Sequence, residues 1–380
     1  MNKNFIFAIL ATTLSISGID ILIPILPVNF LRITNSPFLM GVLMGTTSLA
    51  AVLLRPISSS FIGKIGLKKS MIFGDLILSV TAFSYFFTGS FKTLAVLRIF
   101  FGVGIILFFV SVWSLIGVII PSEKRGFALS IYTVAFLFPC FYAPFIGTKL
   151  NVESFTPFLI SGILFLIAVI SCFFIDDRGL RSFDGHGFFA TLFRRDLFIP
   201  GIIIFSVILA DASVTVFLPL IALKRFIGNY GLFFTIFSVS TVFFRLYLGR
   251  YYTDNNRSRF VIWGMILMFL SFIAVGFAKS LPLLLVSGFL YGTGFALTDP
   301  NLFVLIIERR KDFSMTQVMA GYGGFFDFGY AAGPLIMGLI YKNFGESGLY
   351  FSASIFVFIG FLISIIYFKS CRCDRIGELC

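Results

Sequence analysis

Acidic residues lie inside strongly apolar stretches of this chain. Asp20 is in SGIDILIPILP, and Asp211 and Asp327 lie in segments rich in Phe, Ile and Leu. Burying a charge in lipid is costly, so a carboxylate kept there usually faces a cavity or a partner. Such a group can bind a proton or a cationic group reversibly. We therefore expect Asp20 and Asp327 to bind protons or cations, with Asp211 as a near mirror of Asp20.

Other charged residues in apolar segments have more local interpretations. Arg98 lies at a depth similar to that of Asp20, and an ion pair between them would respond to the arrival of a proton or a solute. Asp299 is a further candidate for binding a proton or a solute, but it ranks below the other acids. It comes directly before Pro300, so backbone groups freed by that proline could satisfy it. Asp75 lies near the predicted cytoplasmic start of its helix, where a solvated or capping role is expected.

The elements that carry these residues are predicted by composition. The 380 residues are 58% hydrophobic and 12% charged and include 54 Phe, which excludes a soluble globular protein. Apolar segments of roughly 20 residues have the length of a helix that crosses a bilayer. The sequence therefore predicts an all-α membrane protein with about twelve transmembrane helices, near 5–27, 37–62, 70–88, 93–117, 126–148, 155–175, 197–222, 230–252, 259–278, 281–306, 315–341 and 347–368.

The basic residues predict the orientation. If the N-terminus is inside, most of the 29 Lys and Arg fall in segments on the inner side. This asymmetry satisfies the positive-inside rule and predicts a multi-pass protein of the cell (inner) membrane with both termini cytoplasmic. The net charge of +12 is then a topology signal, so no nucleic-acid partner is expected. The first apolar run has no convincing cleavage site and is interpreted as a retained helix.

The two halves of the chain repeat each other. Arg55 and Arg245 are 190 residues apart, and so are Pro144 and Pro334. The glycines of Gly102-x-Gly104 match those of Gly292-x-Gly294 at the same shift. We expect two pseudo-symmetric six-helix bundles with a substrate site between them near the bilayer midplane. The predicted parts are an N-terminal bundle, a cytoplasmic linker, a C-terminal bundle and a cytoplasmic tail, at 1–175, 176–196, 197–368 and 369–380.

At this point the chain resembles the major facilitator superfamily over nearly its whole length. Four sets of residues carry the resemblance. The loop between helices two and three matches a superfamily pattern at Gly66, Lys68 and Lys69, with Gly63 at the acidic position. Helix four has Arg98-x3-Gly102-x-Gly104. Helix five has Ala143-Pro144-x2-Gly147, a variant of the motif associated with antiporters, and helix eleven has Asp327-x-Gly329-x3-Gly333-Pro334.

The resemblance implies a monomeric secondary transporter that alternates access around a cavity lined by helices one, four, seven and ten. The favoured mode is proton-coupled efflux of a small organic solute, such as a drug or a siderophore-like metabolite. In this interpretation Asp20 and Asp327 bind protons or cationic groups, and Arg98 holds a carboxylate or tunes Asp20. A proton-coupled uptake symporter is the alternative. A membrane enzyme or a non-transporting scaffold is a different class, for which no nucleophile–base or metal cluster is evident.

Several of the motif residues also have plain structural interpretations. For Arg55 and Arg245 we favour a structural role, either snorkelling or bonding to carbonyls of a neighbouring helix. Small residues let helices approach, and prolines kink them, whether or not the kinks flex during transport. Gly63-x2-Gly66 is not a phosphate-binding loop, because the pattern that would define one is absent.

The remaining residues predict no further chemistry. His186 lies in the polar linker and is expected to be solvated. Cys371, Cys373 and Cys380 in the tail are expected to be reduced thiols, because they would face the cytoplasm and lack further ligands. No metal or cofactor is expected.

Overall fold

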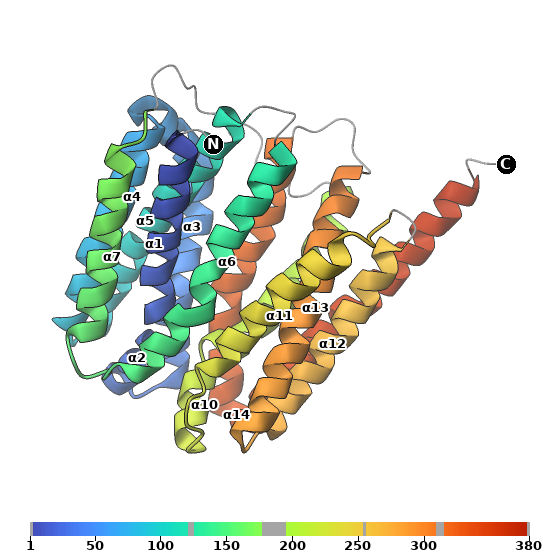
Figure 1. Ribbon diagram of the computed structural model, residues 1–380. Helices are drawn as coiled ribbons and strands as arrows, with labels where there is room; N and C mark the ends of the chain where they lie inside the picture. The colour runs from blue at the N-terminus through green and yellow to red at the C-terminus, as the bar shows by residue number, and fades with distance from the viewer. Residues whose placement is uncertain (1–2, 121–124, 177–194, 254–255, 309–314, 378–380) are drawn as a thin grey trace. The chain divides into compact units, whose positions relative to one another are not determined.

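The computed structural model describes residues 3–120, 125–176, 195–253, 256–308 and 315–377, and every element in these ranges is a helix (Figure 1). The predicted all-α class is confirmed. Residues 177–194 of the predicted linker 176–196, among them His186, lie outside the described residues, and so do the side chains of the tail cysteines.

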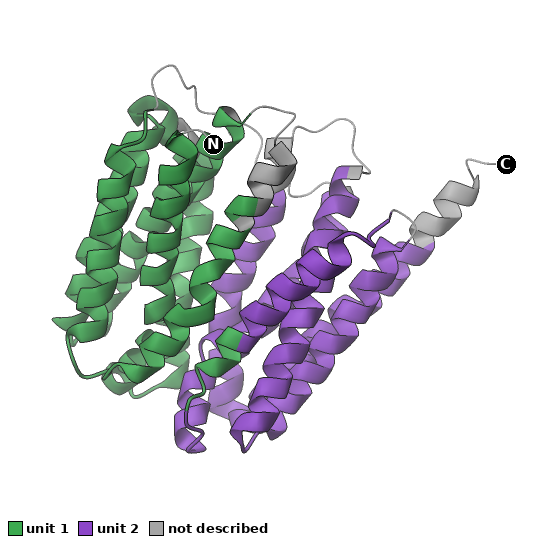
Figure 2. Cartoon of the chain, in the orientation of Figure 1, with its two compact units in different colours: residues 1–186, 229–235 green, residues 187–228, 236–380 purple. Residues whose placement is uncertain are grey.

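The chain forms two compact units, which Figure 2 shows in different colours. Unit 1 comprises residues 1–186 and 229–235, and unit 2 comprises residues 187–228 and 236–380. Unit 1 contains α1 (Lys3–Leu22), α2 (Leu26–Thr34), α3 (Pro37–Ile65), α4 (Leu67–Phe86), α5 (Phe91–Ile119), α6 (Arg125–Lys149) and α7 (Thr156–Phe173). Unit 2 contains α9 (Arg195–Thr215), α10 (Leu218–Lys224), most of α11 (Leu232–Gly249), α12 (Arg257–Phe277), α13 (Leu281–Glu308) and α14 (Met315–Gly377).

The helices have the length and composition of membrane spans. Nine helical stretches among the described residues are long and apolar enough to cross a membrane. One of them, Gly321–Lys369, joins the last two predicted spans, which meet at Gly345 with a φ of 68°. Such a φ favours glycine, because other side chains rarely adopt it. The α6 helix contributes a shorter apolar stretch, Val134–Lys149, and the first turn of α4 holds the polar Lys68 and Lys69.

The first span of each unit is interrupted, which the sequence did not predict. Residues 5–27 were expected to form one helix, but α1 ends at Leu22 and α2 begins at Leu26. Residues 197–222 were expected to form another, but α9 ends at Thr215 and α10 begins at Leu218. Prolines explain the breaks, since Pro27 and Pro219 open the second segments and donate no backbone hydrogen bond. Both units therefore place a helix break a few residues after a buried acid.

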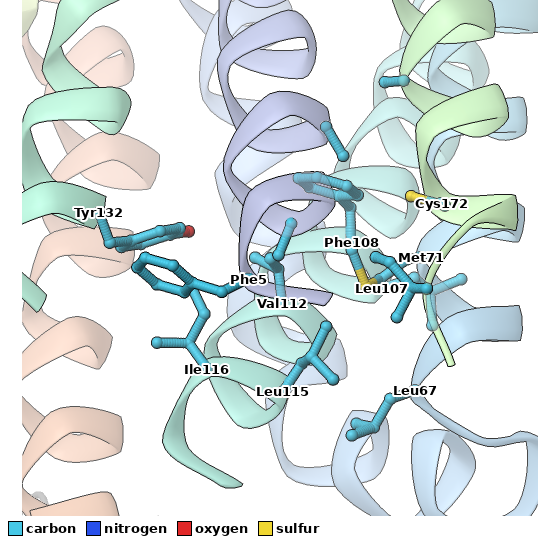
Figure 3. Close-up of a cluster of buried hydrophobic side chains, with 14 of the residues drawn as sticks. Phe5, Leu67, Met71, Leu107, Phe108, Val112, Leu115, Ile116, Tyr132 and Cys172 are labelled. Carbon is cyan, nitrogen blue, oxygen red and sulfur yellow. The ribbon is translucent and has the colours of Figure 1, made fainter. Parts of the chain in front are cut away.

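The core of unit 1 is a cluster of apolar side chains from six helices (Figure 3). Phe108 and Leu115 of α5, Met71 of α4 and Tyr132 of α6 are fully buried in it. Tightly packed cores resist deformation, so the polar groups beside them are held in defined positions. This core joins α1, α3, α4, α5, α6 and α7.

Candidate functional site

Asp20 lies in the last turn of α1 and contacts α6. Its side chain is 6% exposed, and Oδ2 accepts a hydrogen bond of 3.1 Å from the Cys140 thiol. A thiol is a weak donor. Among the described residues, no Lys or Arg lies within ion-pair distance of Asp20. Asp20 is thus a buried acid without a cationic partner in the part of unit 1 that the structure describes.

The surface where α1 meets α6, here called the α1/α6 seam, is polar along one line. Thr13, Ser17 and Asp20 share a face of α1 because their spacing follows the helical repeat. The Ser17 hydroxyl lies 2.7 Å from the Tyr142 hydroxyl, and the Thr13 hydroxyl donates to the Ala135 carbonyl at 3.3 Å. These contacts place three polar groups of α1 in register with α6.

Proline and glycine shape α6 for this contact. Pro139 has no N–H, so the Ala135 carbonyl lacks its usual partner within the helix and receives the Thr13 hydroxyl instead. At Gly147 an added Cβ would lie 2.4 Å from the Ile21 carbonyl, so only glycine lets α6 approach α1 here. The Pro144–Gly147 pair therefore lies where α6 packs on the end of α1.

Asp211 on α9 is the counterpart of Asp20 in unit 2, but its partner is different. Its side chain is 5% exposed, and the Tyr291 hydroxyl of α13 donates to Oδ1 at 2.5 Å. The Tyr291 ring is stacked on Phe237, with ring centroids 4.8 Å apart. A hydroxyl on a ring fixed in this way holds the carboxylate more firmly than a thiol does.

Arg98 does not form the expected ion pair with Asp20. It is 5% exposed and donates to the carbonyls of Leu43 and Met44 of α3, at 3.0 and 2.9 Å. The reason is the helix face on which it lies. Gly102, one turn later, packs so closely on α3 that an added Cβ would be 2.4 Å from the Thr47 carbonyl. Arg98 therefore points toward α3 and not toward Asp20.

Asp299 is also satisfied differently from the interpretation based on Pro300. Arg245 of α11 forms an ion pair with Asp299 Oδ2, and the Tyr322 hydroxyl of α14 donates to Oδ1 at 3.2 Å. Arg245 thus has a carboxylate partner within unit 2. Asp327 is half buried on α14.

The comparisons with known proteins agree with this architecture. Residues 8–226 and 201–372 match the family model described as Major Facilitator Superfamily. The chain belongs to the Major Facilitator Superfamily. It is a multi-pass membrane transporter and not an enzyme.

Its relatives in this superfamily include transporters of Staphylococcus aureus. The chain is 23% identical to the staphylopine export protein of strain Mu50 / ATCC 700699 over 345 residues, which are 86% of each chain. It is 23% identical to the quinolone resistance protein NorA over 385 residues, covering 93% of this chain and 94% of NorA.

Solved superfamily structures share the fold. The human organic anion transporter MFSD10 (TETRAN) aligns with a TM-score of 0.68 at 15% identity, over 95% of this chain and 99% of that one. The nucleoside transporter NupG aligns with a TM-score of 0.73 at 15% identity, over 97% of this chain and 99% of that one.

The superfamily motif residues lie mainly at helix contacts and turns. Gly66, with a φ of 95°, separates α3 from α4, and Lys68 donates to the Phe173 carbonyl at 2.6 Å. Gly104 packs on Gly74 of α4, and Gly333, next to Pro334, packs on Ala212 of α9. Arg55 is half buried, and Gly63 and Lys69 are exposed.

Asp75 is not solvated or capping, as its position suggested. It is fully buried, and Oδ1 accepts a hydrogen bond of 2.8 Å from the Ser15 hydroxyl of α1. Oδ2 accepts no hydrogen bond from the residues that the structure describes. The helix α4 starts at Leu67, so Asp75 lies two turns inside it and faces α1.

Sequence reasoning missed Cys140 and Tyr291 as partners of the two acids. The signal for Tyr291 was its place directly before Gly292, on the repeated glycine pattern of α13. The signal for Cys140 was its place directly after Pro139.

Proposed function

We propose that this transporter exports a small organic solute in exchange for protons. The observation that carries the proposal is the pair of acids Asp20 and Asp211, which are 6% and 5% exposed and have no ion-pair partner among the described residues. A carboxylate in such a place is either protonated or bound to a cationic group. Mutually exclusive binding of the two is the simplest basis for exchange.

Asp20 is the acid that we assign to this exchange. Its partner is the weak donor Cys140, so replacing that hydrogen bond by a solute contact costs little. We propose Asp327, half buried on α14, as a second group for protons or cations. For Arg98 to hold a solute carboxylate, as the resemblance implies, it would have to release the Leu43 and Met44 carbonyls.

The direction of transport is proposed from the relatives. The staphylopine export protein and the quinolone resistance protein NorA bear names that describe removal of a compound from the cell. They support efflux by this chain. Uptake by symport is the alternative, and the shared fold of the nucleoside transporter NupG is compatible with it. We further propose a monomer with both termini in the cytoplasm, as the distribution of basic residues predicts.

The test begins with the protein expressed in cells that lack their own efflux pumps. Solutes in cytosol and medium are compared, and solutes that change are then assayed in everted membrane vesicles with an imposed proton gradient. We expect solute uptake into everted vesicles that requires acid inside and is lost in Asp20→Asn. The control is Glu153→Gln, whose side chain is 68% exposed. Proton-driven uptake in right-side-out vesicles would instead establish the symporter.

A further inference from the structure

A groove lies along the α1/α6 seam of unit 1. It has a volume of about 420 Å³ and is lined by Thr13, Ile131, Val134, Ala135 and Phe138. Its walls are almost entirely apolar, and the Val134 and Phe138 side chains are 43% and 52% exposed. A groove of this size lies in the range of sites that bind small organic molecules.

The groove and Asp20 lie on the same face of α1. Thr13, at the groove, is seven residues before Asp20, which corresponds to about 10 Å along the helix axis. Between them lie the hydroxyls of Ser17 and Tyr142, 2.7 Å apart. A molecule lying along the seam would therefore meet an apolar surface, then two hydroxyls, and then a buried carboxylate.

The charges around Asp20 favour a cation at that end. On α6 it meets the neutral Cys140 thiol. Arg98 of α5 is turned toward α3, and α1 itself has no other acid or base in the seam. The seam thus offers one negative charge and no positive charge among the described residues.

We propose that this groove is a binding site for the apolar part of an amphipathic organic cation whose charged group is bound by Asp20. The cation replaces the Cys140 thiol as the partner of the carboxylate, and the apolar part covers Val134, Ala135 and Phe138. An extended chain covers about 3.5 Å per three bonds, so a chain that spans about 10 Å needs about nine bonds. The use of the site in transport rests on the proposed function, but binding itself does not.

Two probes of equal charge and different length test the site. Radiolabelled butyltrimethylammonium is too short to reach from Asp20 to the groove, and dodecyltrimethylammonium is long enough. Binding is measured at equilibrium to the full-length protein in nanodiscs, with empty nanodiscs subtracted to remove partition into lipid. We expect Val134→Trp to lower the affinity for the dodecyl probe by about tenfold and to leave the butyl probe within about twofold, because each lost methylene contact is worth about fourfold.

Matched variants separate the groove from general effects. Val239, 42% exposed on α11, is the control site for the same Val→Trp change. Phe138→Ala serves as the second groove variant, with Phe351→Ala as its control, since Phe351 is 67% exposed in unit 2. Asp20→Asn is expected to weaken both probes by about tenfold, which is the loss of one charge-assisted contact.

Three results would overturn the site. The groove is rejected if Val134→Trp and Phe138→Ala leave the dodecyl probe unchanged or weaken both probes equally. The role of Asp20 is rejected if Asp20→Asn leaves the affinities unchanged. Equal binding of dodecanoate and the dodecyl cation would identify a groove for lipid chains instead. Because no proton gradient is used, intact binding together with absent efflux would reject the proposed function alone.

Discussion

Asp20 and Asp211 occupy corresponding places in the two units, yet their hydrogen bonds differ in strength. The acid of unit 1 accepts from the Cys140 thiol at 3.1 Å, whereas the acid of unit 2 accepts from the Tyr291 hydroxyl at 2.5 Å. A phenol hydroxyl is a far better donor than a thiol. The repeat has therefore kept the acid and changed its partner, and the more weakly held acid is the better candidate for binding and release.

The same contrast appears in two Arg–Glu pairs, each 121 residues apart in sequence. In unit 1, Arg32 and Glu153 form an ion pair of 2.8 Å with side chains 52% and 68% exposed. In unit 2, Arg225 and Glu346 are 16% and 18% exposed at 3.0 Å, and Lys224 joins them. Arg225 also donates to carbonyls at the end of α12. The Arg–Glu pair of unit 2 is therefore mostly buried and has further partners, whereas the pair of unit 1 is exposed to solvent.

The largest difference is expected between the two acids in transport. Asp20→Asn should lower proton-driven solute movement by about a hundredfold, or about 2.7 kcal/mol, because the exchange site loses its charge. Asp211→Asn should lower the rate less than about threefold at equal protein level. In the unaltered protein the Asp211 carboxylate stays hydrogen-bonded to Tyr291, so its loss does not remove the exchange site. Initial rates in everted vesicles measure both. If both variants lost the same fraction of the transport rate, the claim that Asp20 rather than Asp211 forms the exchange site would be contradicted.

A smaller difference is expected between the two ion pairs in stability. Glu346→Gln should lower the free energy of unfolding by about 2 kcal/mol, because two cations lose a partly buried carboxylate. Glu153→Gln should lower it by less than about 0.5 kcal/mol, as is usual for exposed pairs. Equilibrium unfolding in mixed micelles compares the two variants. If Glu153→Gln lowered the free energy of unfolding as much as Glu346→Gln, the claim that the ion pair of unit 2 is the stronger one would be contradicted.

The smallest difference is expected between the partners of the two acids. Tyr291→Phe should cost about 1.5 kcal/mol of stability, because it leaves the Asp211 carboxylate without its donor. Cys140→Ala should cost less than about 1 kcal/mol, since a thiol contributes a weak hydrogen bond. The same unfolding assay serves for both. A larger loss in Cys140→Ala would mean that Asp20 is the firmly held acid.

Much of the fold could be predicted from the sequence. The length of each apolar run is a local signal, and the recurrence of Arg55 and Pro144 as Arg245 and Pro334 is a periodic one. The helix breaks were less accessible. The sequence predicts unbroken helices over 5–27 and 197–222, whereas Pro27 and Pro219 each lie in the first turn of a second helical segment. A proline can occupy the first turn of a helix as readily as it ends one, so its presence alone does not say which side is helical.

The burial of the candidate acids could be predicted from the sequence, but their hydrogen-bond partners could not. Apolar surroundings singled out Asp20 and Asp211. The direction of Arg98 depends on how closely Gly102 lets α5 approach α3, which is a matter of packing. The burial of Asp75 depends on which face of α4 meets α1. Neither the direction of Arg98 nor the burial of Asp75 can be predicted from one segment alone, because the neighbouring helices determine how each helix is rotated about its axis.

Proton release on cation binding tests the central claim, that Asp20 exchanges a proton for a cationic group, most directly. Purified protein in weakly buffered solution is titrated with dodecyltrimethylammonium while the pH is recorded, at a pH where the free acid carries its proton. The account predicts release of about one proton per bound cation, retained in Asp211→Asn and absent in Asp20→Asn, because one carboxylate binds either ligand. Undiminished release in Asp20→Asn would contradict it.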